Sequence, residues 1–182
     1  MSPVQDAVEQ SQYLTFYLAG EEYGIGILQV KEILEYDTLT KVPQTPPSIR
    51  GVINLRGSVV PVVDLAAKFG LPLSPVTKRT CIIIVEVDLE GQRTVMGVLA
   101  DAVSQVMDLT PADIEAPPAF GTAVRVDYLQ GMGKVGKKFV LILDVDRVLS
   151  APELLGASLQ VAAEADRSPS DVTPDGTKEG PA

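Results

Sequence analysis

The stretch that decides the fold is residues 49–65, IRGVINLRGSVVPVVDL. Two apolar runs flank the turn Arg56-Gly57-Ser58, so the stretch predicts a β-hairpin with strands at 49–55 and 59–64. A constant shift along the chain places this hairpin, without a gap, on a second one, LQGMGKVGKKFVLILDV. The matched pairs are Ile49 with Leu129, Gly51 with Gly131, Val60 with Val140, Val62 with Ile142, Val63 with Leu143, Asp64 with Asp144 and Phe69 with Leu149. The chain therefore contains an internal repeat that includes this hairpin.

The upstream part of each repeat is matched by a slightly shorter shift. The pairs are Gly24 with Gly97, Ile25 with Val98, Val30 with Val103 and Ile33 with Val106. Further hairpins are predicted at 13–27 and 79–99, one in each half, and five short strands in each half suffice to close a small barrel. Short helices are predicted at 65–69, 111–114 and 145–155. We therefore predict an all-β fold with a few short helices, in which two tandem five-stranded β-barrels form one compact unit.

The ends of the chain differ in composition from its body. Residues 156–182 are rich in Pro, Ser, Asp and Gly, and hold five acidic residues against two basic ones. Such a segment buries too little apolar surface to offset the entropy of ordering, so it is predicted to be a disordered acidic tail. Residues 1–12 are predicted to be a flexible N-terminus, which leaves one domain at 13–155.

Composition argues against several classes of function. The chain has 15 Lys and Arg against 24 Asp and Glu, a formal net charge of −9, which disfavours nucleic acid as a partner. Histidine, the commonest general base and zinc ligand, is absent. No apolar run is long enough to span a bilayer, and residues 1–12 do not resemble a signal peptide. The single cysteine, Cys81, fits a reducing compartment, so we expect a cytoplasmic protein without direct membrane insertion.

The motifs predict no catalytic residues, no cofactor and no metal site. Residues 131–136 match G-x-G-x-x-G, but a predicted strand follows where a dinucleotide site needs a helix. Asp64 and Asp144 each precede a predicted helix, which favours N-capping over acid–base chemistry. Cys81 begins a strand of isoleucines and is predicted to be a buried small hydrophobe. The chain is therefore not expected to be an enzyme.

Two exposed side chains are candidates for binding a protein partner. Arg56 lies at the tip of a hairpin where the repeat places Gly136, so the barrel itself does not require a cation there. Glu32 lies between Val30 and Ile33, which are expected to face one way while Glu32 points outward. The simpler alternatives are a solubilising turn residue and an exposed acid beside a core pair. Exposed arginine near aliphatic side chains is, however, typical of protein interfaces.

As a set, the motifs resemble the CheW family of chemotaxis coupling proteins, over about residues 12–155. The resemblance rests on Tyr23-Gly24-Ile25, Val30-x-Glu32-Ile33, Gly51-Val52-Ile53-Asn54-Leu55-Arg56-Gly57, Pro61-Val62-x-Asp64-Leu65, Gly97-x-x-x-Asp101-x-Val103-x-x-Val106 and Tyr128-Leu129-x-Gly131. It implies two SH3-like barrels with a groove between them and no catalysis. Members of this family join the cytoplasmic tips of methyl-accepting chemoreceptors to the regulatory domain of the histidine kinase CheA, which alternates with them in array rings.

The resemblance also implies where partners bind. Carried over by position, it places Val30, Glu32, Arg56, Val103 and Val106 in the receptor-facing groove. Kinase contacts are expected at the exposed apolar ends of the barrels, and self-association in array rings is a further expectation. Three alternatives remain open: a coupling protein for a pathway without flagellar output, a module that binds kinase without receptor, and a small-molecule- or nucleotide-binding double barrel.

Overall fold

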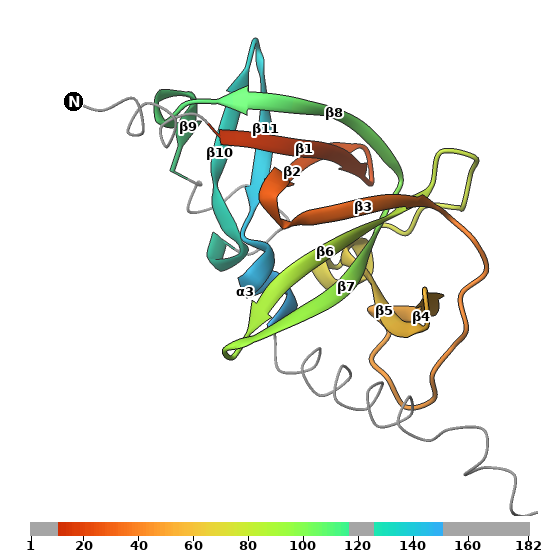
Figure 1. Cartoon of the computed structure of the whole chain (residues 1–182). Coiled ribbons are helices and arrows are strands. Elements are labelled where there is room, and N and C mark those ends of the chain that lie inside the picture. The colour runs from red at the N-terminus through yellow and green to blue at the C-terminus, as the bar shows by residue number, and fades with distance from the viewer. Residues whose placement is uncertain (1–10, 117–125, 151–182) are drawn as a thin grey trace, which may run out of the picture.

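The computed structural model describes residues 11–116 and 126–150 (Figure 1). The predicted N-terminal segment, except residues 11–12, and the predicted tail lie outside these residues. In chain order, with η marking 3-10 helices, the elements are β1 (Ser11–Leu18), β2 (Glu21–Gly26), η1 (Ile27–Gln29), β3 (Val30–Glu35), β4 (Ile49–Leu55), β5 (Ser58–Asp64), α2 (Leu65–Phe69), β6 (Cys81–Leu89), β7 (Gln92–Ala100), β8 (Ala102–Leu109), η2 (Pro111–Asp113), β9 (Ile114–Glu115), η3 (Val126–Tyr128), β10 (Leu129–Val135), β11 (Lys138–Leu143) and α3 (Val145–Leu149). The predicted hairpins and all-β class are confirmed.

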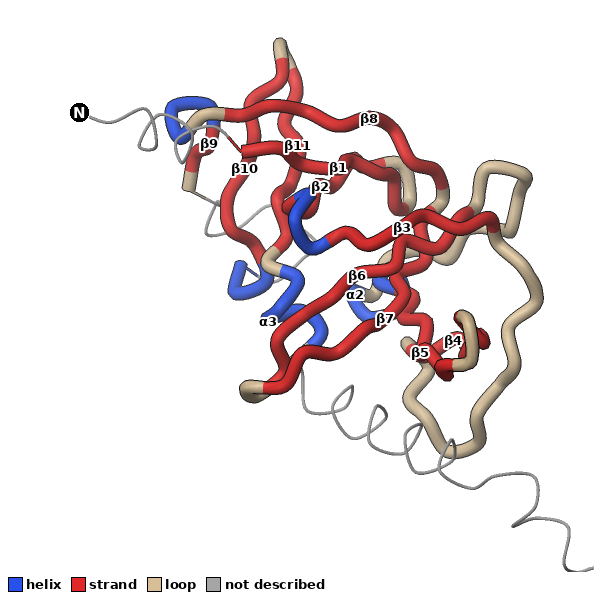
Figure 2. The backbone as a smooth tube through the Cα atoms, viewed as in Figure 1, coloured by secondary structure: helices blue, strands red, loops and turns tan. Residues whose placement is uncertain are grey.

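The strands form two sheets, each of which curls into a small barrel (Figures 1 and 2). The first barrel has the strand order β3-β6-β7-β5-β4, and the second has β8-β1-β2-β11-β10-β9. The structure differs from the prediction in two respects: among the described residues the second sheet has six strands instead of five, and the halves of the chain do not each close a barrel. Instead, the β1–β2 hairpin joins the strands of the second half, and the β6–β7 hairpin joins those of the first.

Each exchanged hairpin is joined to its barrel by an antiparallel pair, β1 with β8 or β6 with β3, and by a parallel pair that contains a closely packed glycine. Gly24 on β2 pairs with Ile142 on β11, and Gly97 on β7 pairs with Val62 on β5. A Cβ atom on Gly24 would lie 3.0 Å from Cδ1 of Ile142, and one on Gly97 would lie 2.9 Å from Cγ2 of Ile82. A side chain at Gly97 would therefore displace Ile82, and one at Gly24 would require Ile142 to shift, so both repeat-related glycines lie where side chains pack closely around the parallel pairs.

The largest hydrophobic cluster lies between the two sheets and receives side chains from both. We call it the shared core; it includes Phe16 and Tyr23 from the second barrel and Ile83 from the first. Smaller clusters fill each barrel: Val60, Val62, Ile82, Ile84 and Leu99 in the first, and Tyr13, Leu109, Val140 and Ile142 in the second. Alternate residues of β6 therefore point into the first barrel and into the shared core.

The motifs that raised the question of catalysis have structural roles. Asp64 accepts a hydrogen bond from the backbone N–H of Ala67, and Asp144 accepts one from that of Arg147, so both N-caps are confirmed. The glycines of the G-x-G-x-x-G stretch lie on β10 and in the turn before β11. A Cβ atom on Gly131 would lie 2.6 Å from Cγ2 of Ile114. Close approach of β9 to β10 thus explains this glycine without a bound phosphate.

The remaining predictions about single elements are met where the structure describes them. Cys81 is buried, as expected. The predicted helix at 111–114 is the 3-10 turn η2, and the Asp113 carboxylate accepts hydrogen bonds from the backbone N–H and the hydroxyl of Thr110. Helix α3 matches the start of the helix predicted at 145–155, whose last residues lie outside the described chain. No helix among the described residues has the length and apolar character that crossing a membrane requires.

Candidate partner-binding surfaces

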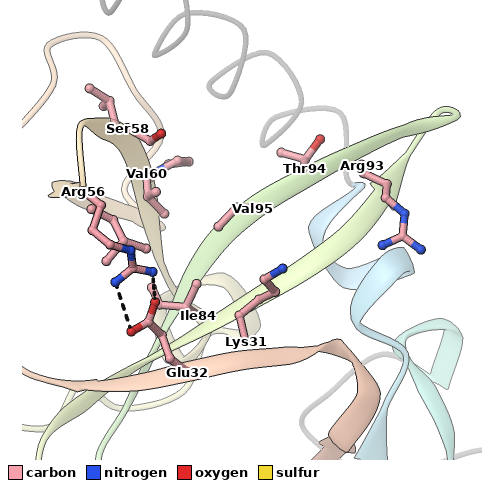
Figure 3. A pocket seen from close by; sticks show the side chains of 12 residues that line it. Lys31, Glu32, Arg56, Ser58, Val60, Ile84, Arg93, Thr94 and Val95 are labelled. Carbon is pink, nitrogen blue, oxygen red and sulfur yellow. Dashed lines mark hydrogen bonds and ion pairs between the residues drawn. The ribbon is translucent and has the colours of Figure 1, made fainter.

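A groove of about 510 Å³ opens on the first barrel between the edge strand β3 and the β4–β5 hairpin (Figure 3). Its lining residues are Lys31, Glu32, Leu55, Arg56, Ser58, Val59, Val60, Pro61, Ile84, Arg93, Thr94 and Val95. Apolar side chains from β5, β6 and β7 contribute to its lining, while charged side chains from β3, the hairpin turn and β7 lie around them. We call it the barrel groove.

Arg56 and Glu32 form an ion pair across this groove. The turn Arg56-Gly57 has positive φ values of 50° and 89°, and the Asn54 side chain accepts a hydrogen bond from the N–H of Gly57 at 2.9 Å. This turn directs the guanidinium to Glu32, where Nη2 contacts Oε2 and Nη1 lies 3.5 Å from Oε1. The arginine lowers the pKa of Glu32 through a hydrogen bond. The structure thus brings together two residues that the sequence suggested separately.

The Arg56 side chain is 72% exposed, so its pair with Glu32 is accessible to water and to partners. Exposed ion pairs contribute little to folding stability, because water already solvates both charges well. The same pair presents a planar cation with several further hydrogen-bond donors at the mouth of an apolar groove. Such a combination is better suited to binding than to holding the barrel together.

Strand β3 presents its residues to two different surfaces. Val30 pairs with Val85 and Ile33 pairs with Ile83, both of which face the shared core. A register shift lies between Val30 and Glu32, and Glu32 pairs with Ile84 on the groove side. Val30 and Ile33 therefore lie on one side of β3, as predicted, whereas Glu32 faces the barrel groove and is only 29% exposed instead of pointing fully outward. Ile33 is 44% exposed, however, so of the expected core pair only Val30 packs against the core.

Strand β8 repeats this arrangement on the second barrel. Val103 pairs with Phe16 and Val106 pairs with Leu14, again with a register shift between the two pairs. Val103 packs against the shared core, and Val106 is 48% exposed. We call the four matched residues, Val30, Ile33, Val103 and Val106, the inter-sheet residues. Ile33 was not singled out from the sequence as a binding residue, although the internal repeat matches it to Val106.

The five residues implied by the resemblance therefore lie on two surfaces. Glu32 and Arg56 line the barrel groove, whereas Val30, Val103 and Val106 do not. Those three belong to the inter-sheet residues, on the shared-core sides of β3 and β8. Strand β3 connects the two surfaces, because it carries Val30 on one side and Glu32 on the other.

Exposed apolar side chains also occur next to the equivalent hairpin turns of the two barrels. Val59 follows the first residue of β5 and Phe139 follows that of β11, and the repeat places one on the other. Both are more than one third exposed although their neighbours Val60 and Val140 are buried. Val59 and Phe139 are therefore exposed apolar side chains at the barrel ends, where the sequence led us to expect kinase contacts but identified no particular residue.

A buried carboxylate on the second barrel was missed from the sequence. The Glu22 side chain is only 4% exposed, and its Oε1 lies 2.8 Å from the Nζ of Lys138. Burial raises the pKa of Glu22, but the Lys138 ammonium and the hydroxyls of Thr15 and Ser104 outweigh that effect, so the pKa is lowered overall. The ion pair joins β2 to β11, which come from opposite ends of the domain.

We expect the Glu22→Gln variant to lose part of the pH dependence of stability. A carboxyl whose pKa is lowered by folding stabilises the protein above its ordinary pKa of 4.5, and that contribution is lost as the pH falls through the folded-state value. Urea unfolding of both proteins between about pH 6 and about pH 3 measures the difference. The two free energies of unfolding should converge toward low pH; a constant difference would contradict the assignment.

Comparison with known proteins places the chain in a family. Residues 12–153 match the family described as CheW-like domain. The chain is 39% identical to Chemotaxis protein CheW of Klebsiella aerogenes over 143 residues, which cover 79% of this chain and 84% of that protein. It is 35% identical to Chemotaxis protein CheW of Bacillus subtilis over 138 residues, covering 75% and 85%.

A solved structure agrees with this match. The scaffolding protein TtCheW from Thermoanaerobacter tengcongensis superposes with a TM-score of 0.70 at 34% identity, covering 79% of this chain and 90% of that one. The two-barrel architecture and the sequence thus lead to the same assignment: the chain belongs to the CheW-like domain family.

Proposed function

We propose that this chain is a non-catalytic adaptor that couples the cytoplasmic tips of methyl-accepting chemoreceptors to the histidine kinase CheA. The observation that carries the proposal is the family match over residues 12–153, which spans both barrels and the surfaces between them. An adaptor needs two surfaces in one rigid unit, and the inter-sheet residues and the exposed barrel ends at Val59 and Phe139 are candidates for these two surfaces.

The receptor tip is proposed to bind the inter-sheet residues Val30, Val103 and Val106, with Glu32 and Arg56 beside them. Aliphatic anchors with polar contacts at their rim are typical of the central part of a protein interface. The kinase regulatory domain is proposed to bind the exposed apolar barrel ends at Val59 and Phe139. Because these two sites are equivalent by the repeat, alternating binding through both ends would generate rings.

Signalling then needs no chemistry from the adaptor itself. A scaffold transmits a signal when its binding free energy for one partner depends on which of two states the other partner adopts. This difference in binding free energy is usually about 1–3 kcal/mol. The protein is proposed to act in the cytoplasm, recruited to membrane-associated receptor arrays.

The proposal is tested by titrating the full chain with a purified kinase regulatory domain and, separately, with a chemoreceptor tip fragment at fixed salt. We expect micromolar binding to both. Binding to the kinase alone would indicate a module that occupies the kinase without coupling it. Binding to neither would contradict the proposal, and a thermal-shift screen with nucleotides would then test the ligand-binding alternative, since ligand at 100 times its Kd stabilises by about 2.7 kcal/mol.

Replacing Val106 with lysine is expected to weaken receptor binding about tenfold while leaving kinase binding unchanged. The side chain is half exposed, so a lysine can extend into water without disturbing the core, but it removes an apolar anchor. Leu73→Lys is the matched control, because Leu73 is an exposed apolar residue in the loop after α2. Equal effects of both substitutions on receptor affinity would contradict the placement.

A further inference from the structure

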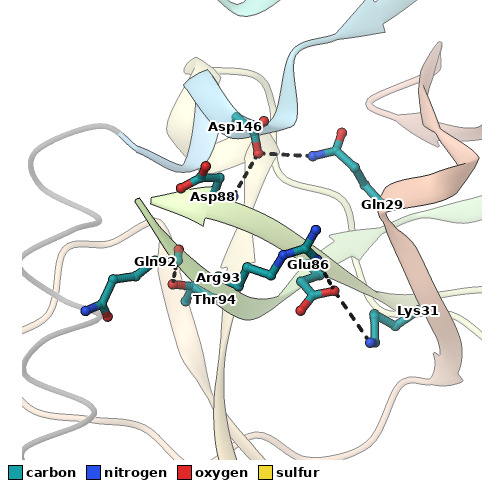
Figure 4. A network of polar contacts seen from close by, with 8 residues as sticks. All are labelled: Gln29, Lys31, Glu86, Asp88, Gln92, Arg93, Thr94 and Asp146. Carbon is teal, nitrogen blue, oxygen red and sulfur yellow. Dashed lines mark hydrogen bonds and ion pairs between the residues drawn. The ribbon is translucent and has the colours of Figure 1, made fainter. Parts of the chain in front are cut away.

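The barrel groove carries a local excess of positive charge on an acidic protein. Lys31 and Arg93 both contact the same oxygen of Glu86, at 3.6 Å and 3.0 Å (Figure 4). Their side chains are 50% and 79% exposed, so both cations remain accessible from solvent. Together with Arg56, these cations outnumber the carboxylates that they contact, Glu32 and Glu86. A net positive groove on a chain of net charge −9 indicates an acidic occupant.

The described chain ends just after helix α3, which is attached to the β6–β7 hairpin that lines part of this groove. Helix α3 is fixed to the β6–β7 hairpin, because the Asp146 carboxylate accepts a hydrogen bond from the N–H of Asp88 at 3.1 Å. The same oxygen accepts a hydrogen bond from the Gln29 side chain at 3.0 Å. Asp88 pairs across the hairpin with Arg93, which lines the groove. Residue 150, one residue after α3, therefore lies a few residues beyond the point at which the chain is attached to the β6–β7 hairpin, one strand of which carries Arg93.

The segment that follows, residues 151–182, has a composition that is complementary to this groove, because it is acidic and contains apolar residues. It contains six acidic residues and two basic ones. Its apolar residues include Leu154, Leu155, Leu159 and Val161, in the first part of the segment. The groove offers an apolar lining that includes Val60, Ile84 and Val95, with cations around it. We propose that the C-terminal segment 151–182 binds the barrel groove of its own chain, with its acidic residues contacting Lys31, Arg56 and Arg93.

Attachment to the same chain makes even a weak contact effective. A flexible chain as long as this segment has an end-to-end distance of about 30 Å, enough to reach along the groove from residue 150. Tethering at this length gives an effective concentration in the millimolar range, so an intrinsic dissociation constant of that order suffices for half occupancy. Any partner that contacts Arg56 must first displace the segment. Such binding goes beyond the proposed function and holds whether or not receptor and kinase bind as proposed.

The test uses the full chain and no partner. A nitroxide is attached to the cysteine of a Ser168→Cys variant, among the acidic residues of the segment. Burial raises the pKa of the native Cys81 thiol, which leaves little reactive thiolate, so the label attaches at the new position. We expect paramagnetic broadening of the backbone amides of Lys31, Thr94 and Val95. The double variant Lys31→Gln/Arg93→Gln should reduce that broadening several-fold, as should raising the salt from about 0.05 M to about 0.5 M.

A matched variant separates the groove from general charge attraction. Lys134 and Lys137 lie on the β10–β11 hairpin, which is also basic, so Lys134→Gln/Lys137→Gln removes the same charge from the second barrel. This control should leave the broadening at the groove unchanged. Broadening centred on that hairpin, or none at all, would overturn the proposal. A mixture of nitroxide-labelled chain with isotope-labelled chain that carries no nitroxide tests whether the segment of a second copy binds the groove. Broadening in that mixture would show binding between copies and would also overturn the proposal.

Discussion

Replacing Arg56 with glutamate is expected to weaken binding to the chemoreceptor tip or to the kinase regulatory domain at least about 30-fold, while the protein still folds. The guanidinium is exposed and pairs with the side chain of Glu32, outside the core, so reversal of its charge leaves the core intact. The new carboxylate would face Glu32 instead of pairing with it. An acidic group on the partner would then meet two negative charges where it had met a cation.

Calorimetric titration of both partners measures this effect, with thermal unfolding as the check on folding. Arg79→Glu is the matched control, because Arg79 is an exposed arginine that does not line the barrel groove. Arg56→Gly adds a second test: the residue has a φ of 50°, which glycine adopts readily, and the repeat places Gly136 there with a φ of 63°. That variant should fold and also lose affinity. Unchanged affinity for both partners in both Arg56 variants would exclude this residue from the interface.

Replacing Phe16 with alanine is expected to destabilise the whole protein by about 3–5 kcal/mol. The side chain is fully buried in the shared core, and its ring stacks on Tyr23 at a centroid distance of 6.2 Å. The cavity would lie between the two sheets, so both barrels lose packing although Phe16 belongs only to the second.

Urea unfolding and amide hydrogen exchange together test this expectation. The exchange of Ile83 and Val85 on β6 should accelerate as much as that of Leu14 on β1, because the shared core couples the barrels into one cooperative unit. Ile82→Ala is the comparison, since Ile82 lies in the smaller cluster inside the first barrel. Faster exchange confined to the second barrel in Phe16→Ala would show that the barrels unfold separately.

Local signals explain which features were predictable from the sequence. The hairpins, the caps at Asp64 and Asp144 and the buried Cys81 follow from apolar runs, turn residues and neighbours within a few positions. The internal repeat showed that strands of one half have counterparts in the other half, and it therefore predicted two barrels. The first hairpin joins the second barrel because of long-range pairing, antiparallel between β1 and β8 and parallel between β2 and β11, which no local pattern encodes.

The candidate surfaces were predictable only in part, for the same reason. Arg56 and Glu32 were each noticed, but their ion pair joins residues 24 positions apart across the mouth of a barrel. The five residues implied by the resemblance lie on two surfaces because of the register shift in β3, and no sequence pattern reveals that shift. No local pattern marks Glu22 as a buried carboxylate, because its partner Lys138 comes from the other end of the domain.

The exchange of hairpins between the barrels has a consequence during synthesis. The β1–β2 hairpin leaves the ribosome before the other strands of its barrel, and its neighbour β11 begins only at Lys138. At a usual elongation rate of about 5–20 residues per second, the edge of β2 that pairs with β11 waits roughly 6 to 22 s for its partner strand. The nascent chain therefore passes through a period in which an aggregation-prone strand edge is unprotected, and a chaperone that binds short apolar strands would have its natural target there.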